Sequence, residues 1–296
     1  MRVAVIGLGS NSLRMLVVNI QDGHLRDRKR YREGLRIFEA LDENRCISSA
    51  MMERAAAQTA AFCQAAREEG AEDISLFATS AVRDARNQED FVLAIQHSCG
   101  YPVEICSGEE EAALSFWGAC TQEDCGLIDI GGGSTEIAVG KGRRIDFSDS
   151  LQLGAVRLFR ERTIASAQDA YQLSREMEGS IREKLLSFSL PEKWVGVGGT
   201  FTAAAALALG AHWEHKEKIH GCPLTLETTE KSIELLSPLS VEERRCLPGV
   251  QPQRADIIVH GLAILHSCFQ VLGCREITVS EYGNLEGFAK KKYIYP

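Results

Sequence analysis

Hydrophobic residues along the chain alternate between short runs with strand periodicity and longer stretches with helical periodicity. The clearest short run is Leu127 to Val139, where an apolar segment ends in an acid, crosses three glycines and a Ser-Thr pair, and returns to an alternating apolar pattern. This order predicts a strand, a tight turn and a second strand. We predict further strands at residues 74–77, 102–106, 144–153, 194–197 and 276–279, and helices at 49–69, 87–100, 109–117, 167–188, 201–209, 254–272 and 283–291. Alternating strands and helices predict an α/β fold with two domains and mixed five-stranded sheets.

A second turn with the same pattern lies near the N-terminus, between the apolar runs 4–8 and 13–17. When the two turns are overlaid, Gly9 falls on Gly131 and Ser12 on Ser134, which indicates an internal duplication. Glycines let backbone N–H groups point at one anion, and hydroxyls add donors, so we interpret both turns as phosphate loops facing a cleft between the domains. The alternative for each is an ordinary hairpin tip. The candidate phosphate-binding residues are Gly9, Ser10, Asn11 and Ser12, and Gly131, Gly132, Gly133, Ser134 and Thr135.

Composition narrows the class of protein. With 296 residues and 45% apolar content, the chain can bury two separate cores, which we divide as residues 1–119 and 120–296. No secretory leader or membrane-length apolar run is visible, so a cytoplasmic location is expected. The ten cysteines show no metal-binding spacing and are interpreted as reduced.

Charge argues against two classes of partner. The net charge of −8 disfavours broad binding of nucleic acid or of an anionic membrane, because both need a positive field. The most basic segment, residues 26–36, could track a polyphosphate or a nucleotide tail, although a solvated pair of strands is the favoured interpretation.

Three further features carry candidate chemistry. Arg83 lies in a strand-to-helix connection, where a guanidinium could clamp phosphate or form a structural ion pair. Three acids, Glu109, Glu110 and Glu111, stand at the start of a predicted helix. Either they interact favourably with the helix dipole, or one of them faces the cleft and takes a proton from water. Gly198, Gly199 and Thr200 join a strand to a helix and form either an anion site or a close packing contact.

Taken together, these segments resemble the exopolyphosphatase/guanosine pentaphosphate phosphatase (Ppx/GppA) family of the actin, Hsp70 and sugar-kinase superfamily. The resemblance covers nearly the whole chain and implies two ribonuclease-H-like (actin-like ATPase) domains with a cleft between them. It rests on residues 9–14, 78–87, 107–112, 129–136, 153–157, 198–200 and 254–256, which stand in the family's order.

The resemblance also implies roles for single residues. Glu111 would be the general base, and Asp129 and Glu136 would hold Mg²⁺ or the attacking water. Arg14 and Arg83 would neutralise the terminal phosphoryl group, and the glycine loops would cradle the phosphates. One departure stands out, because the family has an aspartate where this chain has Gly7. We therefore expect weaker binding of the divalent ion, or a shift of the ion onto Asp129, Glu136 and Glu111.

The expected function is removal of a terminal phosphate from inorganic polyphosphate or from guanosine pentaphosphate. The helical extension of long family members is absent from this sequence, which predicts a preference for short polyphosphate. One alternative is an ATP-dependent phosphotransferase with adenosine at Gly198–Thr200, and another is an inactive sensor of guanosine tetraphosphate or pentaphosphate, which Gly7 keeps open. A homodimer is expected from the resemblance alone.

Overall fold

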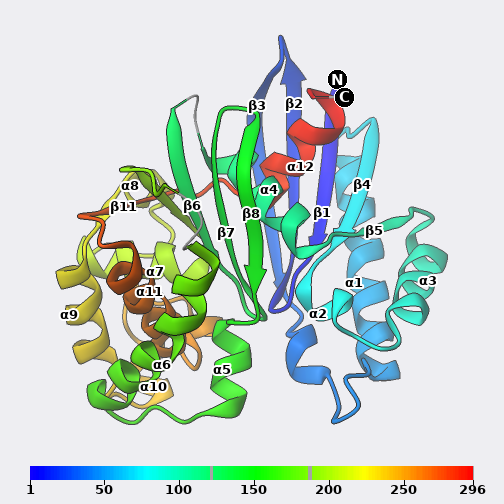
Figure 1. Cartoon of the computed structure of the whole chain (residues 1–296). Coiled ribbons are helices and arrows are strands. Elements are labelled where there is room, and N and C mark those ends of the chain that lie inside the picture. Colours follow the sequence, from blue (N-terminus) through cyan, green and yellow to red (C-terminus); the bar gives the residue numbers. More distant parts are fainter. Residues whose placement is uncertain (121–122, 186–188, 296) are drawn as a thin grey trace.

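A computed structural model describes residues 1–120, 123–185 and 189–295. It contains two mixed sheets whose helical layers enclose them on both sides (Figure 1). The α/β prediction is confirmed. The predicted helix 167–188 is observed as α6 (Ala167–Leu185), and residues 186–188 lie outside the described residues. Within the described part of the chain, no helix combines the length and the apolar character needed to cross a bilayer.

The first sheet has five strands in the order β3-β2-β1-β4-β5. Its central strand β1 is apolar on both faces, with Ala4 and Ile6 in one core cluster and Val3 and Val5 in another, as expected for a strand covered by helices on both sides. The elements of this half are β1 (Arg2–Leu8), β2 (Ser12–Gln21), β3 (His24–Gly34), η1 (Ile37–Ala40), α1 (Ser49–Glu68), β4 (Asp73–Ala78), α2 (Ser80–Arg83), α3 (Gln88–Cys99), β5 (Val103–Ile105) and α4 (Gly108–Ala119).

The second sheet has six strands in the order β10-β11-β9-β6-β7-β8, so the prediction of five strands is wrong here. The additional strand β10 has two residues and pairs antiparallel with β11, too short a segment to show periodicity. The remaining elements are β6 (Asp124–Ile130), β7 (Thr135–Lys141), β8 (Arg144–Leu151), α5 (Ala155–Glu161), β9 (Trp194–Val197), α7 (Gly199–Ala208), α8 (Lys216–Ile219), β10 (Pro223–Leu224), α9 (Leu226–Leu236), α10 (Val241–Arg245), η2 (Pro252–Arg254), α11 (Ile258–Leu272), β11 (Ile277–Val279) and α12 (Asn284–Tyr293).

Helices α4 and α12 form the layer between the two sheets (Figure 1). Helix α4 packs on β6, β7 and β8, whereas α12 packs on α4, β1 and β2. The two helix backbones approach closely, because a β-carbon at Gly118 would overlap the carbonyl of Gly283 and one at Gly287 would overlap that of Leu114. Phe288 of α12 stacks on Phe77 of the first sheet with ring centroids 4.8 Å apart. Each sheet is therefore completed by a helix from the other half of the sequence.

Candidate active site

The two glycine loops lie against each other where β1 meets β2 and β6 meets β7. A β-carbon at Gly132 would lie 3.2 Å from the Ser10 Cβ and 3.4 Å from the Asn11 Cβ. Both turns close with the same hydrogen bond, from Gly9 N–H to the Ser12 carbonyl at 3.1 Å and from Gly131 N–H to the Ser134 carbonyl at 3.0 Å. This shared geometry agrees with the duplication that the sequence indicates.

Two neighbouring acids in the first turn of α4, Glu110 and Glu111, have different functions. Glu110 closes a capping box, because its amide N–H donates to Ser107 Oγ at 3.1 Å and its carboxylate accepts the Ser107 amide N–H at 3.0 Å. Glu111, one position further, is turned inward, is 6% exposed, and accepts a hydrogen bond from Arg83 Nη1 at 3.0 Å. Arg83 also donates to the Cys106 carbonyl at 3.1 Å, while its Nη2 has no hydrogen-bond partner within the described residues. The structure thus brings the two predicted catalytic side chains into contact.

Two more carboxylates lie buried near this pair. Asp129, at the end of β6, accepts a hydrogen bond from Ser115 Oγ at 2.6 Å. Glu136, directly across the β6–β7 ladder from Asp129, accepts hydrogen bonds from Ser134 Oγ at 2.6 Å and Ser150 Oγ at 2.8 Å. The hydroxyl of Ser134, predicted to bind phosphate, is therefore used to hold Glu136 in this structure.

All three buried carboxylates have a raised pKa, and burial is the largest cause for each. Burial raises the pKa of Glu111, and the negative charge of Asp129 raises it further, against the lowering effect of Arg83. Burial raises the pKa of Asp129 as well, and it raises that of Glu136 well above its usual range with the help of Glu111 and Asp129. Such a cluster has a deficit of positive charge, which a bound cation would relieve.

The donor set fits a hard divalent cation. Carboxylate oxygens are the ligands that Mg²⁺ prefers, and Asp129 and Glu136 supply them. Among the described residues, no group of three His, Cys, Asp or Glu side chains forms a ready-made metal site.

A cavity of about 700 Å³ opens on one side of the carboxylate cluster. Of the predicted site residues, Asn11, Arg14, Asp129, Gly198 and Gly199 line it. A smaller hollow of about 390 Å³ lies on the other side, lined by the partners of the other two carboxylates, Arg83 and Ser150. The carboxylate cluster therefore lies between the two openings.

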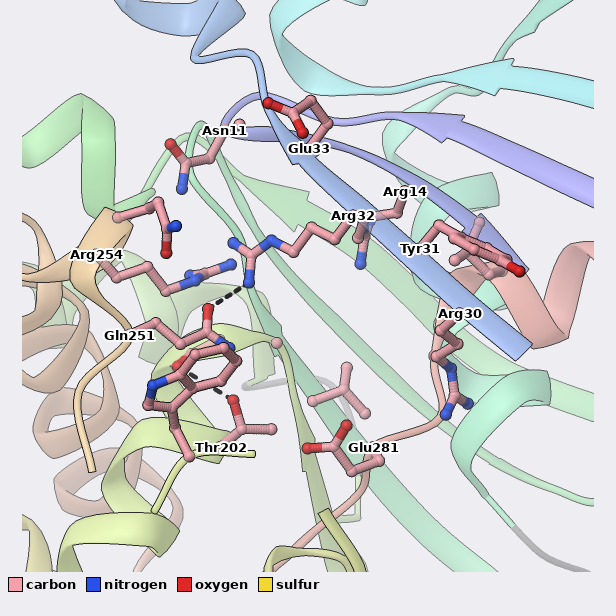
Figure 2. A pocket seen from close by; sticks show the side chains of 18 of the residues that line it. Asn11, Arg14, Arg30, Tyr31, Arg32, Glu33, Thr202, Gln251, Arg254 and Glu281 are labelled. Atoms are coloured by element: carbon pink, nitrogen blue, oxygen red, sulfur yellow. Dashed lines mark hydrogen bonds between the residues drawn. The ribbon is translucent and has the colours of Figure 1, made fainter. Parts of the chain in front are cut away.

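Three arginines that form no direct ion pair in the described part of the chain converge on the wall of the large cavity. Arg14 of β2 and Arg32 of β3 are directly opposite each other in the sheet, and Arg254 reaches in from η2 (Figure 2). None of the three makes an ion pair within the described residues. Their polar contacts are neutral: Arg14 Nη2 donates to Asn284 Oδ1 at 3.2 Å, and Arg32 donates to Gln251.

Burial, together with the proximity of these guanidinium groups, lowers the pKa of two of them. Desolvation and the charge of Arg14 lower the pKa of Arg32 to about 10, although its side chain remains accessible from the cavity. Burial, together with Arg32 and Arg14, lowers the pKa of Arg254 well below its usual range. Like charges opposite each other in a sheet are destabilising. The wall is thus organised for an anion that has several negative charges.

Sequence reasoning missed two of these arginines. Arg32 lies in the basic segment that we interpreted as a solvated strand pair, and its face of β3 turns toward the cavity together with Arg30. The strand alternation of Arg28, Arg30 and Arg32 was the available signal, and it begins directly after Asp27, with φ 48°, where the β2–β3 register shifts. Arg254 was part of the family resemblance, but it carried no role.

The third glycine segment divides between the cavity and the core. Gly198 and Gly199 line the cavity, and a β-carbon at Gly199 would overlap the guanidinium of Arg254, which lies over it. Thr200 is 2% exposed and packs against Gly261 of α11, so it does not line the cavity. Thr135 is likewise turned away, because its hydroxyl donates to the Leu153 carbonyl at 2.6 Å.

The space beside Gly7 is filled in this structure. A β-carbon at Gly7 would lie 3.0 Å from the Phe77 Cζ and 3.2 Å from the Leu285 Cδ2. In this chain, apolar side chains of the first sheet and of α12 occupy the space beside this residue. The glycine that replaces the family's aspartate at position 7 is therefore packed against Phe77 and Leu285.

Comparisons with known proteins agree with this geometry. A model of the Ppx/GppA phosphatase family matches residues 16–293. Exopolyphosphatase 2 of Mycobacterium tuberculosis is 29% identical over 317 residues, covering 97% of each chain. A guanosine-5'-triphosphate,3'-diphosphate pyrophosphatase of Vibrio atlanticus is 30% identical over 97% of this chain and 58% of its own length. The crystal structure of the Aquifex aeolicus member of the Ppx/GppA family superposes with a TM-score of 0.86 at 25% identity, covering 100% of this chain and 98% of its own. The chain belongs to the Ppx/GppA phosphatase family.

Proposed function

We propose that this chain hydrolyses the terminal phosphoanhydride bond of inorganic polyphosphate or of guanosine pentaphosphate. The observation that carries the proposal is the cluster of Arg14, Arg32 and Arg254 on a cavity wall that ends at Asp129, where no described residue forms an ion pair with them. A polyanion bound there would have its terminal group beside the carboxylate cluster. The names of the similar proteins, exopolyphosphatase and guanosine-5'-triphosphate,3'-diphosphate pyrophosphatase, support the same class of substrate.

The three arginines would bind the phosphate chain behind its reacting end. Guanidinium groups match the geometry of phosphate oxygens and donate two parallel hydrogen bonds to them. The contacts of Arg14 and Arg32 to neutral amide oxygens orient these groups without neutralising their charge. Positive charge fixed before binding needs little reorganisation when the substrate arrives.

Glu111 would take the proton from the attacking water. Its burial raises its pKa, which makes the carboxylate a stronger base, and the hydrogen bond from Arg83 fixes its orientation. Phosphoryl transfer needs mainly positioning and charge neutralisation, and one positioned general base contributes about 10² to 10⁴ in rate. Arg83 retains a free Nη2 that could donate to the phosphoryl group.

Asp129 and Glu136 would hold a divalent cation, with Mg²⁺ the best match to their oxygen donors. Such an ion supplies neutralisation of charge on the phosphate oxygens. In its absence, Ser115 and Ser134 keep the two carboxylates in defined positions. The amide N–H groups of Gly132 and Gly133 donate to no acceptor within the described part of the chain, so they remain available for phosphate oxygens.

The test is phosphate release from tripolyphosphate and from guanosine pentaphosphate with Mg²⁺, in wild type and Glu111→Gln. We expect release by wild type, a loss of at least about a hundredfold in the variant, and unchanged affinity for the substrate. The faster substrate names the activity. Tight binding by wild type without release would overturn the proposal in favour of a sensor, and transfer of phosphate only to an added acceptor would indicate a phosphotransferase.

A further inference from the structure

Ser80 carries a buried hydroxyl that no interaction within the described residues satisfies. It is the first residue of α2 and is 1% exposed, and its Oγ has no hydrogen-bond partner. Nearly all buried side-chain polar atoms in proteins have a partner, because an unpaired one loses its hydration without compensation. An exception at this position needs a reason.

The neighbours of this hydroxyl are the two glycine loops. A β-carbon at Gly133 would overlap Ser80 Oγ and lie 2.8 Å from Ser10 Oγ, so both hydroxyls are directed at the tip of the second loop. Ser10 Oγ accepts the Ala81 amide N–H at 3.2 Å, which leaves its own proton without an acceptor within the described residues. Two hydroxyl donors thus border the same glycine.

A third unsatisfied donor lies on the same short helix. The Nη2 of Arg83 is buried without a partner, and Arg83 follows Ser80 by three residues, a spacing that places both side chains on one face of a helical turn. All three groups are donors, and Glu111, the nearest carboxylate to Arg83, is held by Nη1 instead. A ligand that satisfies them must present several acceptor oxygens.

We propose that Ser80 is a further catalytic residue, which donates a hydrogen bond to the terminal phosphoryl group of the substrate together with Ser10 and Arg83. The proposal rests on the proposed phosphohydrolase function. In this structure Ser80 of α2 and Gly133 are in contact, so the phosphoryl group enters as the second glycine loop moves away from α2. The unpaired hydroxyl is then a donor positioned before the substrate binds.

The chain contains a matched control. Ser267 of α11 also has a buried hydroxyl without a partner in the described structure and is 0% exposed, but it packs in the core of the second half. Removing an unpaired hydroxyl relieves a desolvation cost, so Ser80→Ala and Ser267→Ala should both keep or raise the melting temperature. Only Ser80→Ala should affect the phosphoryl group.

The experiment measures kcat for phosphate release, the Kd for tripolyphosphate with Mg²⁺, and the melting temperature of wild type and both variants. We expect Ser80→Ala to lower kcat by about 10² to 10³, as for one lost donor to a developing charge, and to weaken tripolyphosphate binding, with Ser267→Ala at wild-type values. Ser80→Cys, a weaker donor of similar shape, should fall between them. Wild-type kcat and Kd in Ser80→Ala would overturn the proposal, as would a melting temperature lowered in Ser80→Ala but not in Ser267→Ala, because the Ser80 hydroxyl would then have a structural partner.

The two proposals fail in distinguishable ways. If wild type hydrolyses neither substrate, the proposed function is wrong, and the Kd for tripolyphosphate still tests Ser80 as a phosphate contact. If Glu111→Gln loses activity while Ser80→Ala keeps it, the function stands and the role of Ser80 is refuted.

Discussion

Gly199→Ala should displace Arg254 from the cavity without unfolding the protein. A β-carbon at Gly199 would overlap the Cζ, Nη1 and Nε atoms of Arg254 and no backbone atom is among its nearest neighbours. The guanidinium is the far end of a flexible side chain, so it can move away. Alanine is also a better helix former than glycine by about 1 kcal/mol in a helix interior, and by less in the first turn, where Gly199 lies.

The expected magnitude follows from the contact that is lost. A hydrogen bond to a charged group contributes about 1.5–3 kcal/mol, which corresponds to a factor of about 10 to 150 in Kd at 25 °C. Gly199→Ala should therefore weaken tripolyphosphate binding to the same extent as Arg254→Ala. Because both variants remove the same group from the wall, the double variant should bind no more weakly than either single variant.

Calorimetric titration with tripolyphosphate, together with thermal unfolding, measures both effects. The matched control is Gly179→Ala in the exposed middle of α6, where an added β-carbon meets no atom within 4 Å. It should leave the Kd unchanged. Normal binding by Gly199→Ala alongside weakened binding by Arg254→Ala would refute the steric argument, and normal binding by both would show that the phosphate chain lies elsewhere.

Three other predictions concern stability, pH and metal. Arg244→Met should lower the free energy of unfolding by about 2–4 kcal/mol, because the buried guanidinium donates to three backbone carbonyls; an unchanged urea midpoint would contradict this. Hydrogen bonds from Lys29 and Tyr31 lower the pKa of Glu69 from its usual 4.5 to about 2, so this carboxylate stabilises the fold above pH 4.5 and the benefit is lost as pH falls toward 2. Wild type should then unfold at a higher temperature than Glu69→Gln at pH 7, with the gap closing in acid; a gap independent of pH would exclude this linkage. Mg²⁺ should raise the melting temperature of wild type but much less that of Asp129→Asn, and equal shifts would place the ion elsewhere.

The glycine loops could be predicted from sequence because each is a local feature. Glycine spacing and strand periodicity within some fourteen residues define both turns, and their mutual similarity indicates that they face each other. The sequence also pointed to Arg83 and to the acids at the start of α4, but it did not show which of the three acids would contact Arg83. Only the resemblance singled out Glu111, because the capping role of Glu110 depends on the loop geometry at Ser107.

The arginine wall and Ser80 could not be predicted in the same way. Arg14 and Arg32 become neighbours through the register of two strands, and Arg254 joins them from more than two hundred residues away. Sequence periodicity predicts local elements and does not indicate contacts between residues so far apart. The unpaired state of Ser80 is equally invisible, because it depends on what the surrounding side chains leave unsatisfied.

The position of α12 has a consequence for how the chain folds as it is synthesised. On the inner face of the first sheet, Val3, Val5, Leu16 and Val18 pack with Leu285 and Phe288, which leave the ribosome more than two hundred residues after them. Until then, this face of the sheet lacks the part of its cover that α12 provides and is open to chaperones or to unwanted association. The first half should therefore form an incompletely packed intermediate during synthesis. Docking of α12 should then complete the native packing of both halves.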